Sequence, residues 1–329
     1  MAGSELNVAL LAGGTGGAKL AVGLRDILHG FVTETSPEGR GFDPGLPGRL
    51  DVIANTADDI EIYGVHVSPD PDLITFRLAG VLNAAGYGIE GESHEEMDRR
   101  RAAGEEIWFE LGDDDLAVCA KRAALLVGDF TLAEAHAEAT IDYDTGGARV
   151  LPMSDDPVGT LVTTGGEEVD IQRFLIQLRG AAPIDGVRFD GIEEAEPSPE
   201  ALEAIAAADL IVIGPSNPAI SILPILAVPG MAEAIRERGV PVVAVSPVVG
   251  GEILKGPTKA FAEAAGFSAT PAGIADWYES LHPGLIDAWV ADEPVYGHAH
   301  HLMKVDMATP ELTRIVAGEL LRYAQSVSR

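Results

Sequence analysis

Short, continuous runs of hydrophobic residues recur along this chain, and segments whose apolar positions return roughly every three to four residues lie between them. Runs of the first kind are typical of strands buried on both faces of a sheet, and segments of the second kind are typical of helices with one apolar side. We expect strands at Val8–Ala12, Asp51–Ala54, Leu210–Ile213 and Pro241–Val245, and helices at Lys19–Leu28, Pro199–Ala208 and Met231–Arg238. This alternation predicts an α/β fold, with a mostly parallel sheet covered by helices on both faces.

The middle of the chain, from about residue 84 to about 147, is charged and rich in alanine. This composition suits helices, which we expect at Glu95–Ala103, Leu116–Val127 and Leu132–Glu138. The segment Thr33–Arg49 is rich in Gly and Pro and predicts a surface loop, whereas Gly165–Glu168 predicts a hairpin turn in an outlying antiparallel element. We therefore expect residues 1–329 to form a single α/β domain with an inserted, mainly helical lobe.

The charge of the chain limits the ligands that it can attract. Asp and Glu number 52 against 22 Lys and Arg, which gives a net charge of −30 and disfavours binding to nucleic acid or to an anionic membrane. A phosphate-bearing ligand must then be bound locally, by helix N-termini, a few basic residues or a divalent cation.

Cys119 is the single cysteine, so no internal disulfide forms. No apolar run approaches the roughly 18 residues of a membrane span, so we expect a cytoplasmic protein.

A glycine-rich loop follows the first expected strand. It consists of Gly13, Gly14, Thr15, Gly16 and Gly17, and a helical pattern that includes Lys19 opens after it at Ala18. Glycines let the backbone bend and approach a ligand closely, and unpaired amides at the start of a helix favour a phosphate. The alternative is a tight turn that binds nothing. The loop is neither G-x-G-x-x-G nor G-x-x-x-x-G-K-[ST], so it does not imply an ordinary dinucleotide or nucleoside-triphosphate site.

An acidic segment follows the second expected strand. Its polar residues are Asn55, Thr56, Asp58, Asp59, Asp70 and Asp72. Several carboxylates next to a buried strand suit a hard cation that is held by one or two carboxylates, waters and substrate phosphates. The alternative is an acidic, solvated loop.

Two weaker segments complete the set of candidates. Leu151–Thr160 contains Ser154, Asp155 and Asp156, which either present polar groups to a ligand or only cap and turn the chain. Ile213–Ser221 contains Ser216 and Asn217 in a rigid polar turn that suits recognition of a nucleobase or sugar, or is ordinary strand–helix punctuation.

Taken together and in this order, these segments resemble the 2-phospho-L-lactate or phosphoenolpyruvate transferases of coenzyme F420 biosynthesis, the CofD family. The resemblance rests on seven blocks: Gly13–Gly16, Asn55–Asp59, Ser68–Asp72, Leu111–Asp113, Leu151–Pro157, Gly214–Pro218 and Ser246–Pro247. It implies a Rossmann-like fold, a homodimer and a Mg²⁺-dependent reaction. In that reaction the ribityl hydroxyl of the deazaflavin Fo attacks a guanosine diphosphate-linked lactyl or enolpyruvyl donor, and GMP leaves.

The resemblance also implies roles for single residues. Asp58 and Asp72 are expected to hold the metal and to be catalytic, with Asp59 and Asp70 as supporting acceptors. The alternative for one of these carboxylates is to orient the attacking hydroxyl. The donor phosphates are assigned to the loop Gly13, Gly14, Thr15, Gly16 and Gly17 with Lys19, and the guanosine to Ser216 and Asn217. Fo is assigned to Asn55, Asp59, Asp70, Asp72 and Thr75. Ser154, Asp155 and Asp156 are candidates for a supporting role in the site.

The chain departs from the family pattern at one place. Relatives commonly read Gly-Asp-Arg-Asp where this chain reads Gly112-Asp113-Asp114-Asp115, so an acid replaces an arginine that can bind an oxyanion. Either one of Arg99–Arg101 substitutes for it in space, which we expect, or the donor or the acceptor differs. Two other functions compete with the transferase: a non-catalytic regulator of the same superfamily that binds a nucleotide-sugar or dinucleotide, and an NAD-dependent dehydrogenase. The dehydrogenase is disfavoured because the chain lacks G-x-G-x-x-G and a candidate His or Lys at a hydride site.

Overall fold

A parallel sheet of seven strands forms the centre of the computed structural model, which describes residues 5–30, 47–253 and 257–327. In spatial order its strands are β14 (His300–Leu302), β13 (Ala288–Ala291), β10 (Val242–Val245), β9 (Leu210–Ile213), β1 (Leu6–Ala12), β2 (Gly48–Ala54) and β5 (Arg149–Pro152). Every neighbouring pair in this sheet is parallel. The predicted α/β class is confirmed, and β5, β13 and β14 are additions to the predicted strands.

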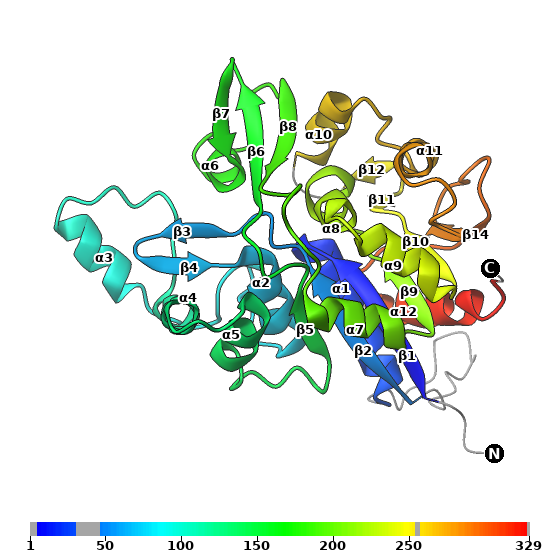
Figure 1. Ribbon diagram of the computed structural model, residues 1–329, viewed down its shortest axis with the longest axis horizontal. Helices are drawn as coiled ribbons and strands as arrows, with labels where there is room; N and C mark the ends of the chain where they lie inside the picture. The colour runs from blue at the N-terminus through cyan, green and yellow to red at the C-terminus, as the bar shows by residue number, and fades with distance from the viewer. Residues whose placement is uncertain (1–4, 31–46, 254–256, 328–329) are drawn as a thin grey trace.

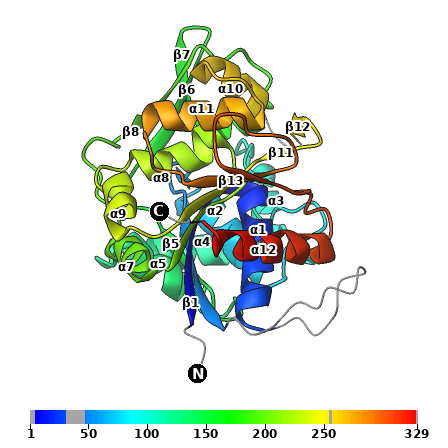
Figure 2. The same ribbon diagram turned by 90° about the vertical axis from the view of Figure 1, so that its right-hand side faces the viewer.

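Helices cover both faces of the sheet, because successive side chains of a strand point to opposite sides. Ala9 and Leu11 of β1 belong to one hydrophobic core, and Val8, Leu10 and Ala12 belong to the other. The second core is covered by α1 (Gly14–Leu28), α2 (Pro69–Leu78) and α12 (Pro310–Ala324), of which α1 and α12 lie side by side (Figure 2). The first core is covered by α7 (Pro199–Ala207), η1 (Pro218–Ile222), α8 (Leu223–Ala227), α9 (Met231–Arg238), α10 (Thr258–Ala265) and α11 (Pro271–Leu281).

The order of the strands creates a switch point beside β1. From β1 the chain moves outward to β2 and β5, and it later returns to the other side of β1 at β9 before moving outward to β14. Ligands of open α/β sheets bind at such a point, beyond the carboxyl ends of the strands. The glycine-rich loop after β1 and the turn after β9 therefore lie next to each other.

The glycine-rich loop is shorter than the sequence predicts. Helix α1 begins at Gly14 rather than near Ala18, so Thr15, Gly16 and Gly17 lie in its first turn. Glycines carry no apolar side chain, so a pattern of hydrophobic positions cannot mark the true start of this helix.

A lobe is inserted between β2 and β5 and projects from the sheet on the left of Figure 1. It contains the hairpin β3 (Ile60–Ile62) and β4 (Val65–Val67), followed by α3 (Glu95–Ala102), α4 (Asp113–Val127) and α5 (Leu132–Ala139). The three predicted helices are present. The hairpin packs against α4 around the buried Cys119, so the lobe also includes residues that precede the predicted insertion.

A small antiparallel sheet stands apart from the main sheet, at the top of Figure 1. Its strands are β6 (Gly159–Thr164), β7 (Glu167–Asp170) and β8 (Gly186–Asp190), and α6 (Ile171–Ile176) follows β7. The predicted hairpin turn lies between β6 and β7. A short hairpin of β11 (Val248–Val249) and β12 (Glu252–Ile253) follows β10. Most of the predicted loop Thr33–Arg49 lies outside the described residues, and its end, from Gly48, belongs to β2.

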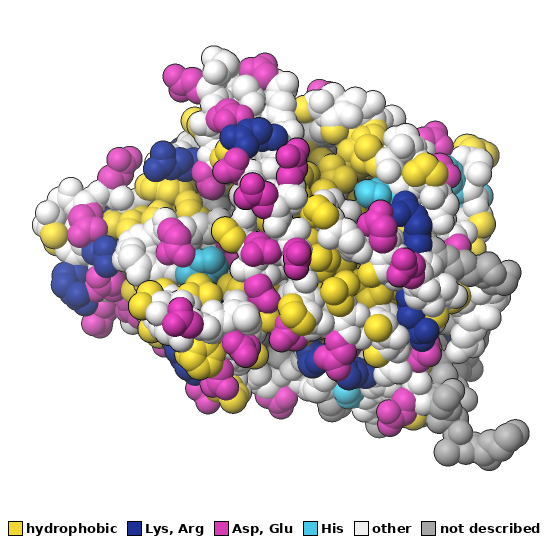
Figure 3. Space-filling view, viewed as in Figure 1, with side chains coloured by type: hydrophobic (Ala, Val, Ile, Leu, Met, Phe, Trp, Pro, Cys, Tyr) yellow, Lys and Arg dark blue, Asp and Glu magenta, His cyan; other side chains and the backbone are white. Residues whose placement is uncertain are grey.

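The surface reflects the composition of the chain. On the face drawn in Figure 3, acidic side chains are spread among apolar ones, and basic side chains form only small, separate groups. Within the described ranges no single helix has the length and apolar character needed to cross a membrane, although the bent pair Pro218–Ala227 and Met231–Arg238 meets those two criteria jointly.

Candidate functional site

A cavity of about 990 Å³ opens at the switch point of the sheet. One end is polar and is lined by the start of α1, the start of α2 and the turn after β9. The other end reaches the inserted lobe and is lined by large apolar side chains: Phe76, Leu82, Tyr87, Trp108 and Phe109. The cavity can therefore take a ligand, or two ligands, with a charged part and a flat apolar part.

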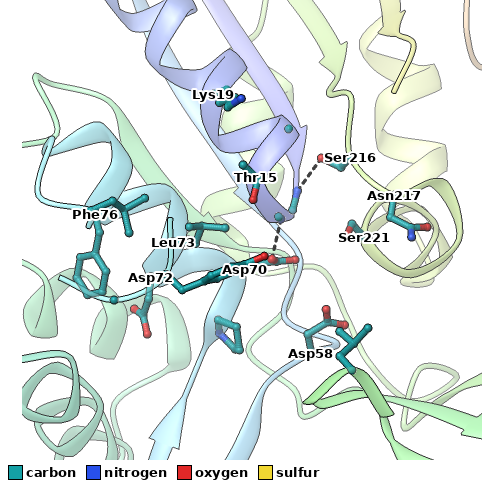
Figure 4. Close-up of a pocket in the computed structure, with 18 of the residues that line it drawn as sticks. Thr15, Lys19, Asp58, Asp70, Asp72, Leu73, Phe76, Ser216, Asn217 and Ser221 are labelled. Carbon is teal, nitrogen blue, oxygen red and sulfur yellow. Dashed lines mark hydrogen bonds between the residues drawn. The ribbon is translucent and has the colours of Figure 1, made fainter. Parts of the chain in front are cut away.

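The N-terminus of α1 already contacts an anion of its own chain. The backbone N–H of Gly14 donates to Oδ1 of Asp70 at 2.6 Å, and the N–H of Gly13 donates to Oγ of Ser216 at 3.1 Å (Figure 4). Amides at the start of a helix attract negative charge, which explains why a carboxylate lies there. A phosphate that binds at this helix must share these amides with Asp70 or displace it.

The glycines of the loop serve close packing as well as access to a ligand. A Cβ atom at Gly13 would clash with Asp70, and one at Gly16 would clash with the backbone oxygen of Pro215. A Cβ atom at Gly17 would lie 2.6 Å from Oγ of Ser216. Gly14 differs, because its φ of +55° favours glycine while no atom lies near the position of its Cβ. Gly14 is thus the loop residue whose outer side is open.

Asp58 and Asp70 form a pair of buried carboxylates at the polar end. Burial raises the pKa of Asp70 to about 6, and burial and the charge of Asp70 raise the pKa of Asp58 well above its ordinary value. Asn55 donates from Nδ2 to Oδ2 of Asp70 at 3.0 Å, and Gln172 on α6 donates from Nε2 to the backbone oxygen of Asp58 at 3.0 Å. The charge of Asp70 thus acts on the Asp58 carboxylate, and two buried carboxylates that interact in this way fit a divalent cation bound between them.

Asp72 lies in a different part of the cavity from that pair. Its carboxylate turns away from Asp58, and Asp70 lies between the two (Figure 4). Arg122 on α4, which is completely buried, donates to Oδ1 of Asp72 and, at 3.0 Å, to the backbone oxygen of His66. Oδ2 of Asp72 is buried and accepts no hydrogen bond from the described residues. The structure thus groups Asp72 with Arg122, a residue that the sequence analysis missed because a lone arginine in a helical pattern carries no signal.

Three of the residues predicted to bind Fo lie behind the cavity wall. Oγ of Ser68 donates to Asp59 at 2.8 Å, and Nε2 of His66 lies 3.0 Å from the same carboxylate. Burial lowers the pKa of His66, but its contacts with Asp59 and Glu61 together outweigh this effect and raise it. Thr75 contacts Nε2 of His136 at 3.2 Å. Asp59, Thr75 and Asn55 therefore shape the site from behind, whereas Asp70 and Asp72 line it.

The side chains of Ser154–Asp156 form hydrogen bonds to backbone groups of other segments, and none of them lines the cavity. Ser154 donates from Oγ to the backbone oxygen of Glu196 at 2.6 Å. Asp155 accepts from the backbone N–H of Ala133 in α5 at 2.9 Å, and Asp156 accepts from that of Glu196 at 2.9 Å. These contacts favour the capping and turning role that the sequence left open.

The turn after β9 lies at the polar end with the glycine loop. Ser216 accepts from Gly13, as described, and Asn217 caps η1 through Oδ1 while it donates from Nδ2 to Oγ1 of Thr258 at 3.1 Å. Ser216, Asn217 and Lys19 all line the cavity. The residues assigned to the donor thus lie together, as the sequence predicts.

Asp114, the acid that stands where relatives carry an arginine, does not belong to the cavity. Asp114 is exposed and does not line the cavity, whereas its neighbour Asp115 does. Burial, with Asp72 and Glu92, raises the pKa of Asp115 to about 7. The expected substitutes also lie elsewhere, because the guanidinium groups of Arg99–Arg101 pair with acids of the lobe: Glu96, Asp98, Glu105 and Glu110. The expectation that one of them replaces the missing arginine is therefore wrong.

Comparisons with known proteins agree with the resemblance seen in the sequence. The family model described as 2-phospho-L-lactate transferase CofD matches residues 8–314. A protein named phosphoenolpyruvate transferase from Streptomyces coelicolor is 38% identical over 293 residues, which cover 87% of this chain and 85% of that one. A 2-phospho-L-lactate transferase from Methanopyrus kandleri is 35% identical over 279 residues, which cover 83% of this chain and 82% of that one.

A solved structure supports the fold alone. The crystal structure of a member of the UPF0052 family from Bacillus halodurans superposes with a TM-score of 0.55 and 21% identity. The superposition covers 88% of this chain and 82% of that one.

Proposed function

We propose that this chain, which belongs to the CofD family of 2-phospho-L-lactate transferases, transfers a phospholactyl or phosphoenolpyruvyl group to the ribityl hydroxyl of the deazaflavin Fo. The donor is a guanosine diphosphate-linked compound, and GMP is released. One observation carries this proposal: a single cavity joins the start of α1 and a pair of buried carboxylates to an apolar, aromatic end. Phosphoryl transfer needs positioning and neutralisation of charge more than covalent help, and this cavity offers both.

The donor is proposed to bind at the polar end. Amides of the α1 N-terminus and Lys19 bind its phosphates, and Ser216 and Asn217 contact the guanosine. The chain as a whole is acidic, so the positive charge needed to bind a diphosphate would come locally, from the N-terminus of α1 and from Lys19.

The residues of this end fit a magnesium ion. Asp58 and Asp70 would hold it, since both are buried, the charge of Asp70 raises the pKa of Asp58, and Asp70 lies at the helix start where a phosphate would bind. Bound there, the ion would neutralise charge on the diphosphate. The sequence named Asp72 as the partner of Asp58, but the geometry favours Asp70 because Arg122 already compensates the charge of Asp72.

Asp72 is proposed to act on the acceptor. Asp72 lines the cavity, and its Oδ2 is buried and has no hydrogen-bond donor among the described residues, so it would accept the proton of a ribityl hydroxyl placed against it. The hydroxyl oxygen then bonds to the phosphorus as the bond from phosphorus to the GMP oxygen breaks. Arg122 fixes the other oxygen of Asp72, and Phe76, Trp108 and Phe109 enclose the deazaflavin ring.

A non-catalytic regulator that binds a nucleotide-sugar or dinucleotide remains the competing function. Such a protein needs no second ligand beside the nucleotide, whereas the apolar end and the unpartnered Asp72 oxygen provide for one. The homodimer and the cytoplasmic location stay predictions, and light scattering of the purified chain tests the first of them.

The experiment is a reaction with Fo, Mg²⁺ and the guanosine diphosphate-linked donors, in which GMP is followed by chromatography and the deazaflavin product by mass spectrometry. We expect GMP release that requires Fo, and a product mass that identifies a lactyl, enolpyruvyl or glyceryl unit. Asp114→Asn is the matched control, because it removes one exposed acid outside the cavity. Binding of GDP without any Fo-dependent release of GMP would instead favour the regulator.

A further inference from the structure

Positive charge is scarce in the cavity. Among the described residues that line it, the acids are Asp58, Asp70, Asp72, Glu92, Glu110, Asp115 and Asp306. Lys19 and Arg179 supply the permanent positive charges in the same lining. Any anionic group of a ligand beyond the reach of the α1 N-terminus therefore depends on these two side chains.

Arg179 lies in a backbone conformation that does not suit it. Its φ is +54°, a left-handed value that costs free energy for any residue with a Cβ, and Gly180 follows with a φ of +59°. The Arg179 side chain is exposed, and the described residues offer it no hydrogen bond or ion pair. The left-handed conformation serves the turn that ends α6, and a glycine would adopt it at lower cost, so the presence of an arginine that lines the cavity points to a role of its side chain.

The surroundings of Arg179 fix it relative to the donor site. It follows α6, whose Gln172 donates to the backbone oxygen of Asp58 at 3.0 Å. The turn is closed by a hydrogen bond from the N–H of Gly180 to the oxygen of Phe174 at 2.9 Å. Gly180 also packs on Pro257, which precedes the Thr258 that holds Asn217. The backbone at Arg179 is thus held between α6, which contacts Asp58, and the segment that contacts Asn217, while its exposed side chain lines the cavity.

We propose that Arg179 binds an oxyanion of the donor, namely the carboxylate of its three-carbon unit. This inference rests on the proposed function. A guanidinium group presents paired donors that match a carboxylate or a phosphate, and the diphosphate already has the amides of α1 and the cation. The carboxylate is the remaining anion of a lactyl or enolpyruvyl donor. Arg179 therefore sets specificity for an acidic three-carbon unit.

The test compares Arg179→Gln, Arg179→Lys and Arg179→Gly with the parent. Arg99→Gln is the matched control, because it removes one arginine that pairs with Glu96 outside the cavity. Calorimetry measures the GDP affinity, and initial rates measure KM for the donor. We expect Arg179→Gln to raise the donor KM at least tenfold while GDP affinity stays within twofold, and Arg179→Lys to recover part of the loss. Arg179→Gly should raise KM as much while its melting temperature equals or exceeds that of the parent, because the strain is relieved.

Three results would contradict the proposed role of Arg179 or the function on which it rests. Loss of GDP affinity together with the rise in KM would move the bound oxyanion from the carboxylate to a phosphate, and would overturn the specificity role. Values within twofold of the parent for both quantities would overturn the inference entirely. If the parent binds GDP but transfers nothing to Fo, the proposed function fails; calorimetry with the donor itself then tests Arg179, and a donor affinity of Arg179→Gln within twofold of the parent overturns its role.

Discussion

Replacing Asp70 by Asn should have opposite effects on nucleotide binding with and without a divalent cation. In the cation-free protein, Asp70 accepts from the N–H of Gly14 at 2.6 Å, so a phosphate at the same helix start meets a carboxylate within a few ångströms. Two unit charges about 4 Å apart repel by about 1 kcal/mol in water and by about 4 kcal/mol at an effective dielectric constant near 20. Taking a value towards the lower of these two limits, we expect Asp70→Asn to tighten cation-free GDP binding by about 1–2 kcal/mol, or about 5- to 30-fold.

The same substitution should harm the protein when magnesium is present. The cation loses one of its two proposed carboxylates, so Mg²⁺ should no longer improve GDP binding, and turnover should fall at least 100-fold. Calorimetry with GDP, in EDTA and then in Mg²⁺, measures both effects above the Asp70 pKa of about 6, where the parent carboxylate is ionised. Asp114→Asn is the control with the same change of charge at an exposed position. Cation-free binding by Asp70→Asn that equals or falls below that of the parent would refute the reasoning.

The same geometry predicts the effects of three other substitutions and of pH on the stability of the protein. Asp72→Asn should lower kcat with Fo while GDP affinity by calorimetry stays unchanged, and a matching loss of GDP affinity would return Asp72 to the donor site. Arg122→Met leaves the buried Asp72 unpaired, so urea unfolding should show a loss of about 3–5 kcal/mol, much of it restored in the double variant with Asp72→Asn. Gly17→Ala should lose about 1–3 kcal/mol by overpacking against Ala12 and Ser216, as melting curves would report. The pKa of Asp70 in the folded protein is raised to about 6, so the protonated side chain favours the folded state. This contribution to the stability of the cation-free protein is complete below pH 3.8, the ordinary pKa, and is lost as the pH rises through about 6. Urea unfolding in EDTA should therefore show a smaller fall in the free energy of unfolding over this pH range for Asp70→Asn than for the parent.

The sequence predicted the four strands β2, β1, β9 and β10 of the central sheet, and it predicted that the residues assigned to the donor lie together. Continuous apolar runs marked β1, β9 and β10, because strands buried on both faces contain few polar residues. The edge strand β14, His300–Leu302, was missed because it is short and partly exposed. The start of α1 was placed too late, because its glycines have no side chains from which a helical period can be read.

The partners within the acidic segment could not be predicted from the sequence. Asp70 and Asp72 are two residues apart in the first turn of α2, so their side chains leave the helix in different directions. One meets the start of α1 and the other meets Arg122, which lies 50 residues away in the chain. Neither direction can be read from spacing alone, because both depend on how α2 and α4 pack beside the sheet. The role of Ser154–Asp156 was likewise undecided until Ala133 and Glu196 were seen as its partners.

The central claim is that Asp58 and Asp70 hold the cation at the phosphates of the donor while Asp72 serves the acceptor. Electron spin-echo spectroscopy of Mn²⁺ in the presence of GDP tests it most directly, because coupling to phosphorus reports an ion bound beside the diphosphate. We predict phosphorus coupling in the parent and in Asp72→Asn, and its loss in Asp58→Asn and Asp70→Asn at protein concentrations where GDP remains bound. Coupling that survives in Asp70→Asn and disappears in Asp72→Asn would contradict the account.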